Sequence, residues 1–166
     1  MRKFWNLIAV ILLTAGSIEL SIAQGVNKKL YNPEADAEND IKRAVAQAKS
    51  EGKHVFIQIG GNWCVWCHRF NDTVMSNDTL NGILHHSYVP IHVNYSPENK
   101  NEKVLASLGY PQRFGFPVFV VLDQNGQRIH TQNSGYLEDG KGHSTKEIFK
   151  FLYSWTPVAI DPDSYK

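Results

Sequence analysis

The spacing of apolar residues predicts an alternation of helices and strands along most of the chain. Residues 33–52 carry apolar side chains at three- and four-residue steps and end in a glycine, which is typical of an amphipathic helix. Residues 54–59 have the alternation of a short strand, with Phe56 on the opposite side from its apolar neighbours. We expect a second strand at residues 88–95 and further helices at residues 64–73, 78–86 and 99–108.

A buried strand and a hairpin are predicted in the second half of the chain. Residues 116–123 form a near-continuous apolar run led by Pro117, as expected of a strand that is buried on both faces. Asn125 and Gly126 then give a strong hairpin signal. Residues 128–131 are therefore expected to return as the neighbouring strand.

One more amphipathic helix closes the predicted domain at residues 144–155. We expect its apolar face to consist of Ile148, Phe149, Leu152 and Trp155. Helices that alternate with strands and end in a hairpin are typical of an α/β fold. The pattern therefore predicts a mixed central sheet with helices on both faces.

The first residues have the composition of an export signal. Residues 1–23 combine a basic start, an apolar run and small residues at the positions that a signal peptidase reads, which predicts a signal peptide cleaved after Ala23. An uncleaved membrane anchor is the alternative, but the apolar run is shorter than the roughly 20 residues of a spanning helix. We expect a loose leader at 24–34, a domain at 35–156 and a tail at 157–166.

Export and charge together restrict the partners. The protein is expected in a bacterial periplasm or, in a eukaryote, secreted or held in the endoplasmic reticulum lumen. The chain has 17 basic and 16 acidic residues, and loss of residues 1–23 leaves it formally neutral. Because it then has no basic field, we expect no nucleic-acid partner and no stable membrane association. No dimerisation segment is visible in the sequence, so we expect a monomer.

The only two cysteines, Cys64 and Cys67, lie three positions apart. Disulfides that staple small secreted domains usually join cysteines spread along the chain, and a bridge across so small a loop adds little stability. The predicted strand and helix place Cys64 at a helix N-terminus, where free N–H groups and the helix dipole stabilise a thiolate. We therefore expect an exposed Cys64 to attack a substrate disulfide and Cys67 to resolve the mixed disulfide.

Two segments resemble the thioredoxin superfamily. They are a Trp-Cys-x-x-Cys motif behind a strand and a proline-led strand, namely Gly60-Gly61-Asn62-Trp63-Cys64-Val65-Trp66-Cys67-His68 and Gly115-Phe116-Pro117-Val118-Phe119. The chain is similar to exported thioredoxin-like proteins that carry this cysteine motif, over residues 35–156. The resemblance implies a thioredoxin fold, reduction or isomerisation of protein disulfides, and no cofactor. It implies protein or peptide disulfides and an upstream thiol donor as partners.

The same resemblance implies roles around the cysteines. By this resemblance, Pro117 would be a cis-proline that faces the disulfide. A cis X–Pro bond is uncommon enough to be a structural requirement where it occurs. Phe116 would offer its backbone to a bound peptide, and Trp63 would cover the site. Trp66 would either face the substrate or fill the groove beside the helix. These four residues are the candidate substrate-binding residues.

One residue departs from the family pattern. Gln58 stands where many thioredoxins keep a buried acidic residue that helps to move the proton of the second cysteine. A glutamine cannot act as an acid or a base, and His68 is the nearest titratable substitute. The alternative is that His68 is a solvent-facing residue of the first helical turn.

Other chemistries fit the cysteines less well. Cys64 to His68 also matches the Cys-x-x-Cys-His signature of c-type haem attachment, but cytochromes c are dominated by helices and Met75 is poorly placed to cross a haem face. Zinc needs four ligands paired at two places in the chain, and the neighbouring His85 and His86 would diverge on a helix. We expect no metal. A redox-silent binding module with this fold is the remaining alternative, although both cysteines are present.

The dipeptide between the cysteines predicts the redox poise. Val65 and Trp66 carry neither a charge nor an imidazole, so the thiolate of Cys64 depends mainly on the helix terminus. We expect a thioredoxin-type pKa of about 7 for Cys64 rather than one of about 3.5. A less stabilised thiolate favours the reduced form less, which predicts a potential between about −270 and −200 mV and a reducing role.

Overall fold

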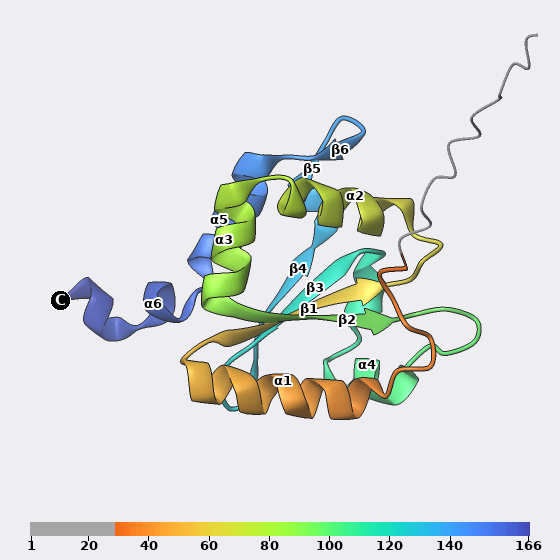
Figure 1. Ribbon diagram of the computed structural model, residues 1–166, viewed down its shortest axis with the longest axis horizontal. Helices are drawn as coiled ribbons and strands as arrows, with labels where there is room; N and C mark the ends of the chain where they lie inside the picture. Colours follow the sequence, from red (N-terminus) through yellow and green to blue (C-terminus); the bar gives the residue numbers. More distant parts are fainter. Residues whose placement is uncertain (1–28) are drawn as a thin grey trace, which may run out of the picture.

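The computed structural model describes residues 29–166, and their centre is a four-stranded mixed sheet (Figure 1). The strands follow the order β2-β1-β3-β4, where β1 pairs in parallel with β2 and antiparallel with β3, and β3 pairs antiparallel with β4. Their bounds are β1 His54–Gly60, β2 Tyr88–Asn94, β3 Val118–Leu122 and β4 Arg128–Asn133. The four strands expected from the sequence are confirmed, and β3 is buried throughout.

Helices α1 (Ala37–Glu51) and α4 (Glu102–Ser107) cover one face of the sheet, below it in Figure 1. Alternate residues of β1 pack against them, including Ile57. Helix α1 begins later than the apolar pattern suggests, because the Asp36 carboxylate caps it by accepting a hydrogen bond from the backbone of Asn39.

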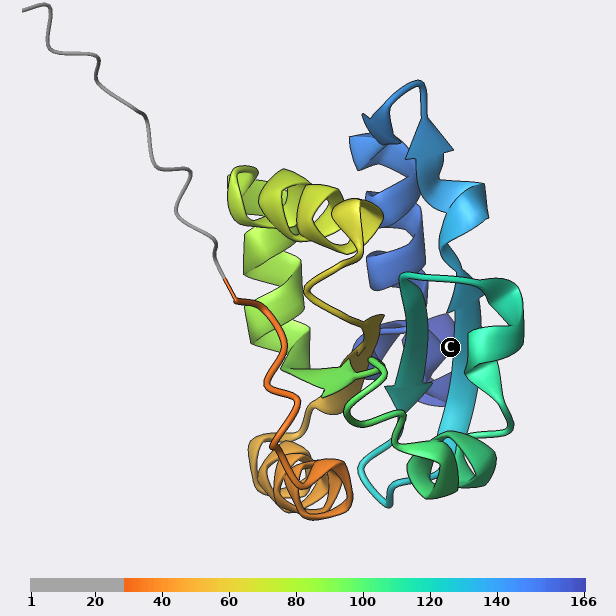
Figure 2. The same cartoon turned by 90° about the vertical axis from the view of Figure 1, so that its right-hand side faces the viewer.

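Helices α2 (Val65–Met75), α3 (Asp78–Ser87) and α5 (Thr145–Ser154) cover the opposite face (Figures 1 and 2). Their contact with the sheet is rich in aromatic rings, and the ring centroids of Phe70 and Phe119 lie 4.2 Å apart. The expected helices on both faces are therefore confirmed.

The predicted apolar face of α5 is wrong at one position. Phe149 is 39% exposed and stacks on Tyr153, whereas Phe151 is buried at 5% exposed. Ile148 and Leu152 set the inward direction of the helix, and Phe151 lies one position before Leu152 on that side. Phe149 follows Ile148 by about 100° of helical turn and points outward.

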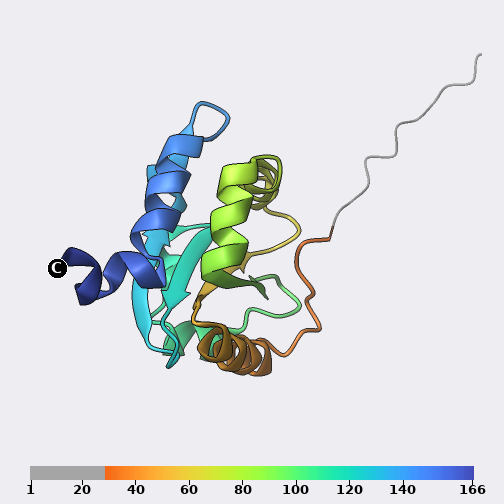
Figure 3. The same cartoon turned by 60° about the vertical axis from the view of Figure 1, so that its left-hand side comes forward.

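Several short elements carry no periodicity in the sequence and were not expected. A two-stranded hairpin, β5 (Glu138–Asp139) and β6 (Gly142–His143), lies between β4 and α5. The tail after α5 contains α6 (Pro157–Ile160) and a 3₁₀ helix at Pro162–Tyr165, and it extends away from the sheet (Figure 3).

The predicted signal peptide lies outside the residues that the structure describes. Within residues 29–166, none of the helices combines the length and the apolar character that crossing a membrane requires.

Candidate active site

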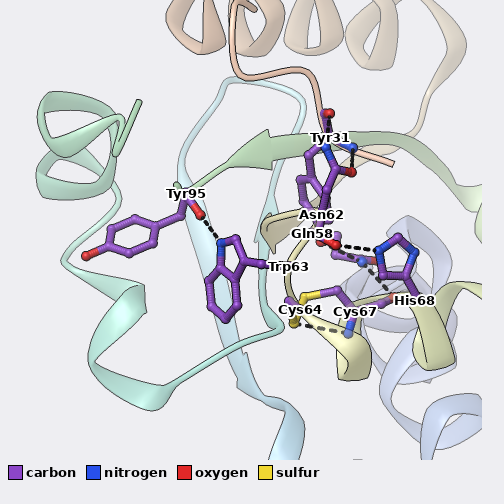
Figure 4. Close-up of a disulfide and its surroundings, with 8 residues drawn as sticks. All are labelled: Tyr31, Gln58, Asn62, Trp63, Cys64, Cys67, His68 and Tyr95. Atoms are coloured by element: carbon purple, nitrogen blue, oxygen red, sulfur yellow. Dashed lines mark hydrogen bonds between the residues drawn. A yellow bond between two sulfur atoms is a disulfide. The ribbon is translucent and has the colours of Figure 1, made fainter. Parts of the chain in front are cut away.

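Cys64 and Cys67 form a disulfide at the start of α2 (Figure 4). Cys64 is the N-cap residue of this helix and has an extended backbone, and its Sγ accepts a hydrogen bond of 3.1 Å from the backbone N–H of Cys67. The sulfur of Cys64 therefore lies where the unpaired N–H groups and the positive end of the helix dipole act. Both features stabilise negative charge on this sulfur once the disulfide is reduced.

The two cysteines differ less in exposure than the sequence suggests. Cys64 is 4% exposed and Cys67 is 0% exposed. The prediction of an exposed Cys64 is therefore wrong, because its side chain is almost completely buried. Cys64 keeps the only solvent contact of the pair, while Cys67 packs against Gly60 at the end of β1. A β-carbon at position 60 would overlap the Sγ of Cys67, so this close approach requires a glycine.

One side of the disulfide, here called the outer side, is formed by the aromatic residues Trp63 and Phe116. Trp63 is 57% exposed, and its Nε1–H donates a 2.8 Å hydrogen bond to the carbonyl of Tyr95. Its ring meets the ring of Phe116 edge-on with the centroids 5.6 Å apart. Phe116 also packs against the buried cysteines, and the Phe116–Pro117 bond is cis, as the resemblance implies.

A largely apolar groove continues from this side. Its volume is about 790 Å³, and Trp63, Tyr95 and Pro97 form part of its lining. Glu98 and Lys100 bring charge to the same groove. The indole of Trp63 therefore separates the disulfide from a hollow that could receive a side chain.

Trp66, in the first turn of α2, is half-buried and packs against the cluster formed by Tyr31 and the two cysteines. The guanidinium of Arg69 stands 4.9 Å from its ring centroid, and His143 of β6 meets the ring edge-on at 5.5 Å. His143 is itself buried, and burial, followed by the charge of Arg69, lowers the pKa of its imidazole. Of the two possibilities for Trp66, these contacts favour the one in which it fills the groove beside the helix.

The other side, here called the inner side, faces Gly60 and Gln58. It is closed by Tyr31, a residue that the sequence pattern did not single out. Tyr31 belongs to the expected loose leader, yet it is only 2% exposed and clusters with both cysteines. Its Oη accepts a 2.8 Å hydrogen bond from Nε2 of Gln58, which also donates to the carbonyl of Cys67 at 3.3 Å. Burial raises the pKa of Tyr31 far above its ordinary value, although the hydrogen bond from Gln58 opposes this.

Asn62 holds this segment in place (Figure 4). The backbone N–H of Tyr31 donates to Oδ1 of Asn62 at 3.0 Å, and Nδ2 of Asn62 donates to the carbonyl of Tyr31 at 2.8 Å. The residue before the Trp-Cys motif thus pairs with the leader much as a neighbouring strand would. The expectation of a loose leader is therefore wrong at Tyr31.

His68 contacts the loop before the disulfide. It is half-buried, and its Nε2 lies 3.1 Å from the backbone carbonyl of Asn62. This contact joins the first turn of α2 to the loop that precedes Cys64. A role for His68 in proton transfer stays a prediction.

The part of the chain that the structure describes contains no group of three His, Cys, Asp or Glu side chains placed to hold a metal ion.

The chain is similar to known proteins of thioredoxin-like fold. Residues 36–124 match a family model described as thioredoxin-like, while no curated protein matches the chain. A solved structure of a disulphide isomerase from Xylella fastidiosa Temecula1 is 24% identical with a TM-score of 0.66, and the match covers 75% of this chain and 94% of that one.

Two further solved structures are similar over 68% of this chain. A DsbH oxidoreductase is 18% identical with a TM-score of 0.50 over 79% of its own length. A thioredoxin from Thermus thermophilus is 21% identical with a TM-score of 0.51 over 81% of its length. At these identities the similarity establishes the shared fold.

Proposed function

The chain belongs to the thioredoxin-like family, and on that premise we propose that it is a thiol–disulfide oxidoreductase that reduces or isomerises disulfides of exported proteins. The observation that carries this proposal is the asymmetry of the disulfide at the start of α2. Cys64 caps the helix and keeps a small solvent contact, whereas Cys67 is fully buried behind it. A substrate can therefore reach one sulfur, and the other is held in reserve.

The reaction consists of two exchanges. The thiolate of Cys64 attacks one sulfur of a substrate disulfide, and the other substrate sulfur leaves as a thiol after taking up a proton. The thiol of Cys67 then loses its proton and attacks Sγ of Cys64, which releases the second substrate thiol. Two electrons pass to the substrate and the Cys64–Cys67 disulfide is formed again. An upstream thiol donor restores the dithiol by the same exchange.

The outer side of the disulfide is the proposed substrate surface. Trp63 and Phe116 present exposed or half-exposed aromatic rings beside Cys64, and cis-Pro117 follows in the same loop. A peptide chain can pack a side chain on the indole and use the backbone at Phe116 for hydrogen bonds. Trp66 is a weaker candidate, because its ring is already packed between Arg69 and His143.

The compartment follows from the proposed chemistry and from residues 1–23. Disulfide substrates are abundant in exported proteins, and a bacterial periplasm supplies them. Two of the similar solved structures are a disulphide isomerase and an oxidoreductase, which supports the same class of reaction here. The full proposal is a monomeric periplasmic enzyme that acts after cleavage of its signal peptide.

Trapping of mixed disulfides tests the proposal. The reduced Cys67→Ser variant, mixed with oxidised insulin, should accumulate a covalent adduct through Cys64 that dithiothreitol releases. The Cys64→Ser variant should form at least tenfold less adduct, because Cys67 is buried. The wild-type protein should catalyse insulin reduction by dithiothreitol. Absence of catalysis, together with a disulfide that persists in excess dithiothreitol, would identify a redox-silent module instead.

The haem alternative has a separate test. In the structure the two sulfurs are bonded to each other, and Nε2 of His68 faces the carbonyl of Asn62. We expect the protein to remain colourless in a host equipped for c-type haem maturation. A covalent product that absorbs in the Soret region would contradict the oxidoreductase proposal.

A further inference from the structure

Cys67 poses a problem of proton chemistry. It is completely buried, and burial in protein disfavours a thiolate. Its thiol must nevertheless ionise to attack the mixed disulfide at Cys64. The side-chain amide of Gln58 donates its two N–H groups to Oη of Tyr31 and to the carbonyl of Cys67, so it has none left for the sulfur. Another group must therefore stabilise the thiolate of Cys67.

The hydroxyl of Tyr31 is in the right place. A β-carbon at position 60 would overlap the Sγ of Cys67 and would stand 2.8 Å from the Oη of Tyr31, so both atoms border the same small space beside Gly60. Tyr31 and Cys67 also belong to one buried cluster, with exposed fractions of 2% and 0%. The phenol and the thiol are therefore neighbours in a space closed to solvent.

The hydroxyl also has a proton to donate. Its oxygen accepts the hydrogen bond from Gln58, and within residues 29–166 this is the only hydrogen bond that the hydroxyl makes. Gln58 thus occupies one lone pair and leaves the O–H free for another acceptor. Burial raises the pKa of Tyr31, which keeps the phenol protonated at neutral pH. A neutral phenol can donate to a thiolate without losing its own proton.

We propose that Tyr31 is the hydrogen-bond donor that stabilises the thiolate of Cys67 during the resolving step. The inference rests on the proposed function and assigns the inner side of the same site. As Cys67 attacks Sγ of Cys64, the bond between Cys64 and the substrate sulfur breaks, and the departing sulfur takes up the proton that Cys67 has lost. The Tyr31 proton stays on its oxygen throughout. Tyr31 acts by charge stabilisation, and Asn62 holds it there through the two backbone hydrogen bonds.

Three other titratable or charged side chains lie on the elements around Tyr31 and Cys67 and could affect a pH profile. The imidazole of His92, on β2, meets the ring of Tyr31 edge-on at 5.3 Å, and burial lowers its pKa. His68 on α2 faces the carbonyl of Asn62, and Arg69 lies over the ring of Trp66. Tyr31→Phe leaves all three side chains in place. Its effect on the titration of Cys67 therefore reports the hydroxyl.

The experiment separates the two exchanges by rapid mixing of reduced protein with the disulfide reagent 5,5′-dithiobis(2-nitrobenzoate). The first thionitrobenzoate is released by Cys64 and the second by attack of Cys67. Tyr31→Phe should slow the second release about tenfold or more near pH 7, because a hydrogen bond to a charged group is being lost, and should change the first by less than about twofold. Tyr88→Phe removes another buried hydroxyl and should change neither.

A titration gives the second readout. In the Cys64→Ser variant, the ¹³Cβ chemical shift of labelled Cys67 follows its ionisation directly, and Tyr31→Phe should raise its pKa by about one unit. An unchanged second release and an unchanged titration in Tyr31→Phe would overturn the proposal. Gln58→Leu keeps the Tyr31 hydroxyl. If it slowed the second release as much as Tyr31→Phe does, the proposal would also be overturned. If the wild-type protein itself releases no second thionitrobenzoate and does not reduce insulin, the proposed function fails independently of Tyr31.

Discussion

The two sides of the Cys64–Cys67 disulfide differ in their exposure to solvent and in the residues that form them. The outer side is formed by Trp63, which is 57% exposed, and by Phe116 next to the cis-proline. The inner side is closed by Tyr31, which is 2% exposed and hydrogen-bonded to Gln58. Our proposals assign substrate contact to the outer side and stabilisation of the Cys67 thiolate to the inner side. Variants on each side should therefore have different consequences.

The largest effect is expected on stability, from the inner side. Tyr31→Ala should lower the free energy of unfolding by about 3–5 kcal/mol, because it removes a buried aromatic ring and leaves a cavity. It also removes one of the two acceptors of Nε2 of Gln58, which keeps only the carbonyl of Cys67. Urea unfolding of the oxidised variant measures the change.

Tyr136→Ala is the matched control for this variant. Tyr136 is 77% exposed, so its truncation should change the free energy of unfolding by less than about 0.5 kcal/mol. Equal losses in the two variants would mean that Tyr31 is no more tightly held than a surface residue, and the inner side would lose its distinct character.

The same contrast explains what the sequence could predict. The strands and α1 follow from regular apolar spacing, and Cys64 at a helix terminus follows from a strand, two glycines and a cysteine in succession. Tyr31 is a single aromatic residue in a polar segment, and its partner Asn62 lies 31 positions away. No local period can signal such a contact.

Side-chain direction also limits sequence reasoning. Apolar character alone could not decide between Phe149 and Phe151 for the inner face of α5. For Trp66 it left two possibilities, and the contacts with Arg69 and His143 favour the one in which the ring fills the groove beside α2. The direction of each side chain is set by helix phase or by tertiary contacts, which the apolar character of the residue does not reveal. Trp63 and Phe116 could be singled out because they belong to the two motifs, and their contact with substrate stays a prediction.

A smaller effect, on substrate recognition, is expected from the outer side. Trp63→Ala should lower kcat/KM for insulin reduction about tenfold, because the exposed indole offers a large apolar contact to a peptide. Release of the first thionitrobenzoate from the small disulfide reagent should change less than about threefold. Trp66→Phe is the comparison and should change insulin reduction by less than about threefold. A larger loss of insulin reduction in Trp66→Phe than in Trp63→Ala would place the substrate surface at Trp66 instead.

The smallest effect concerns acid stability on the inner side. Burial lowers the pKa of His92 in the folded protein below its ordinary value of 6.5. As pH falls below about 6.5 the unfolded chain therefore binds more protons than the folded one, and stability is lost by at most about 1.4 kcal/mol per pH unit for this one group. His130 and His143 act in the same direction.

A pair of variants isolates the share of His92. His92→Gln should reduce the loss of unfolding free energy between pH 7.5 and pH 5.5, measured by urea unfolding. The exposed His85, changed to glutamine, should leave that loss unaltered. A wild-type protein that becomes more stable as the pH falls over this range would contradict the assignment.

The central claim is that the Cys64–Cys67 disulfide is a working redox couple, and its equilibrium potential tests that claim most directly. The protein is equilibrated in dithiothreitol and glutathione buffers of graded ratio, and its free thiols are then trapped by alkylation and counted by mass spectrometry. We predict a reversible two-electron transition with a midpoint between about −270 and −200 mV, because the thiolate of Cys64 depends mainly on the helix terminus. A midpoint above about −150 mV would contradict the reducing role and indicate an oxidase. A disulfide that shows no reversible transition in these buffers would contradict the account as a whole.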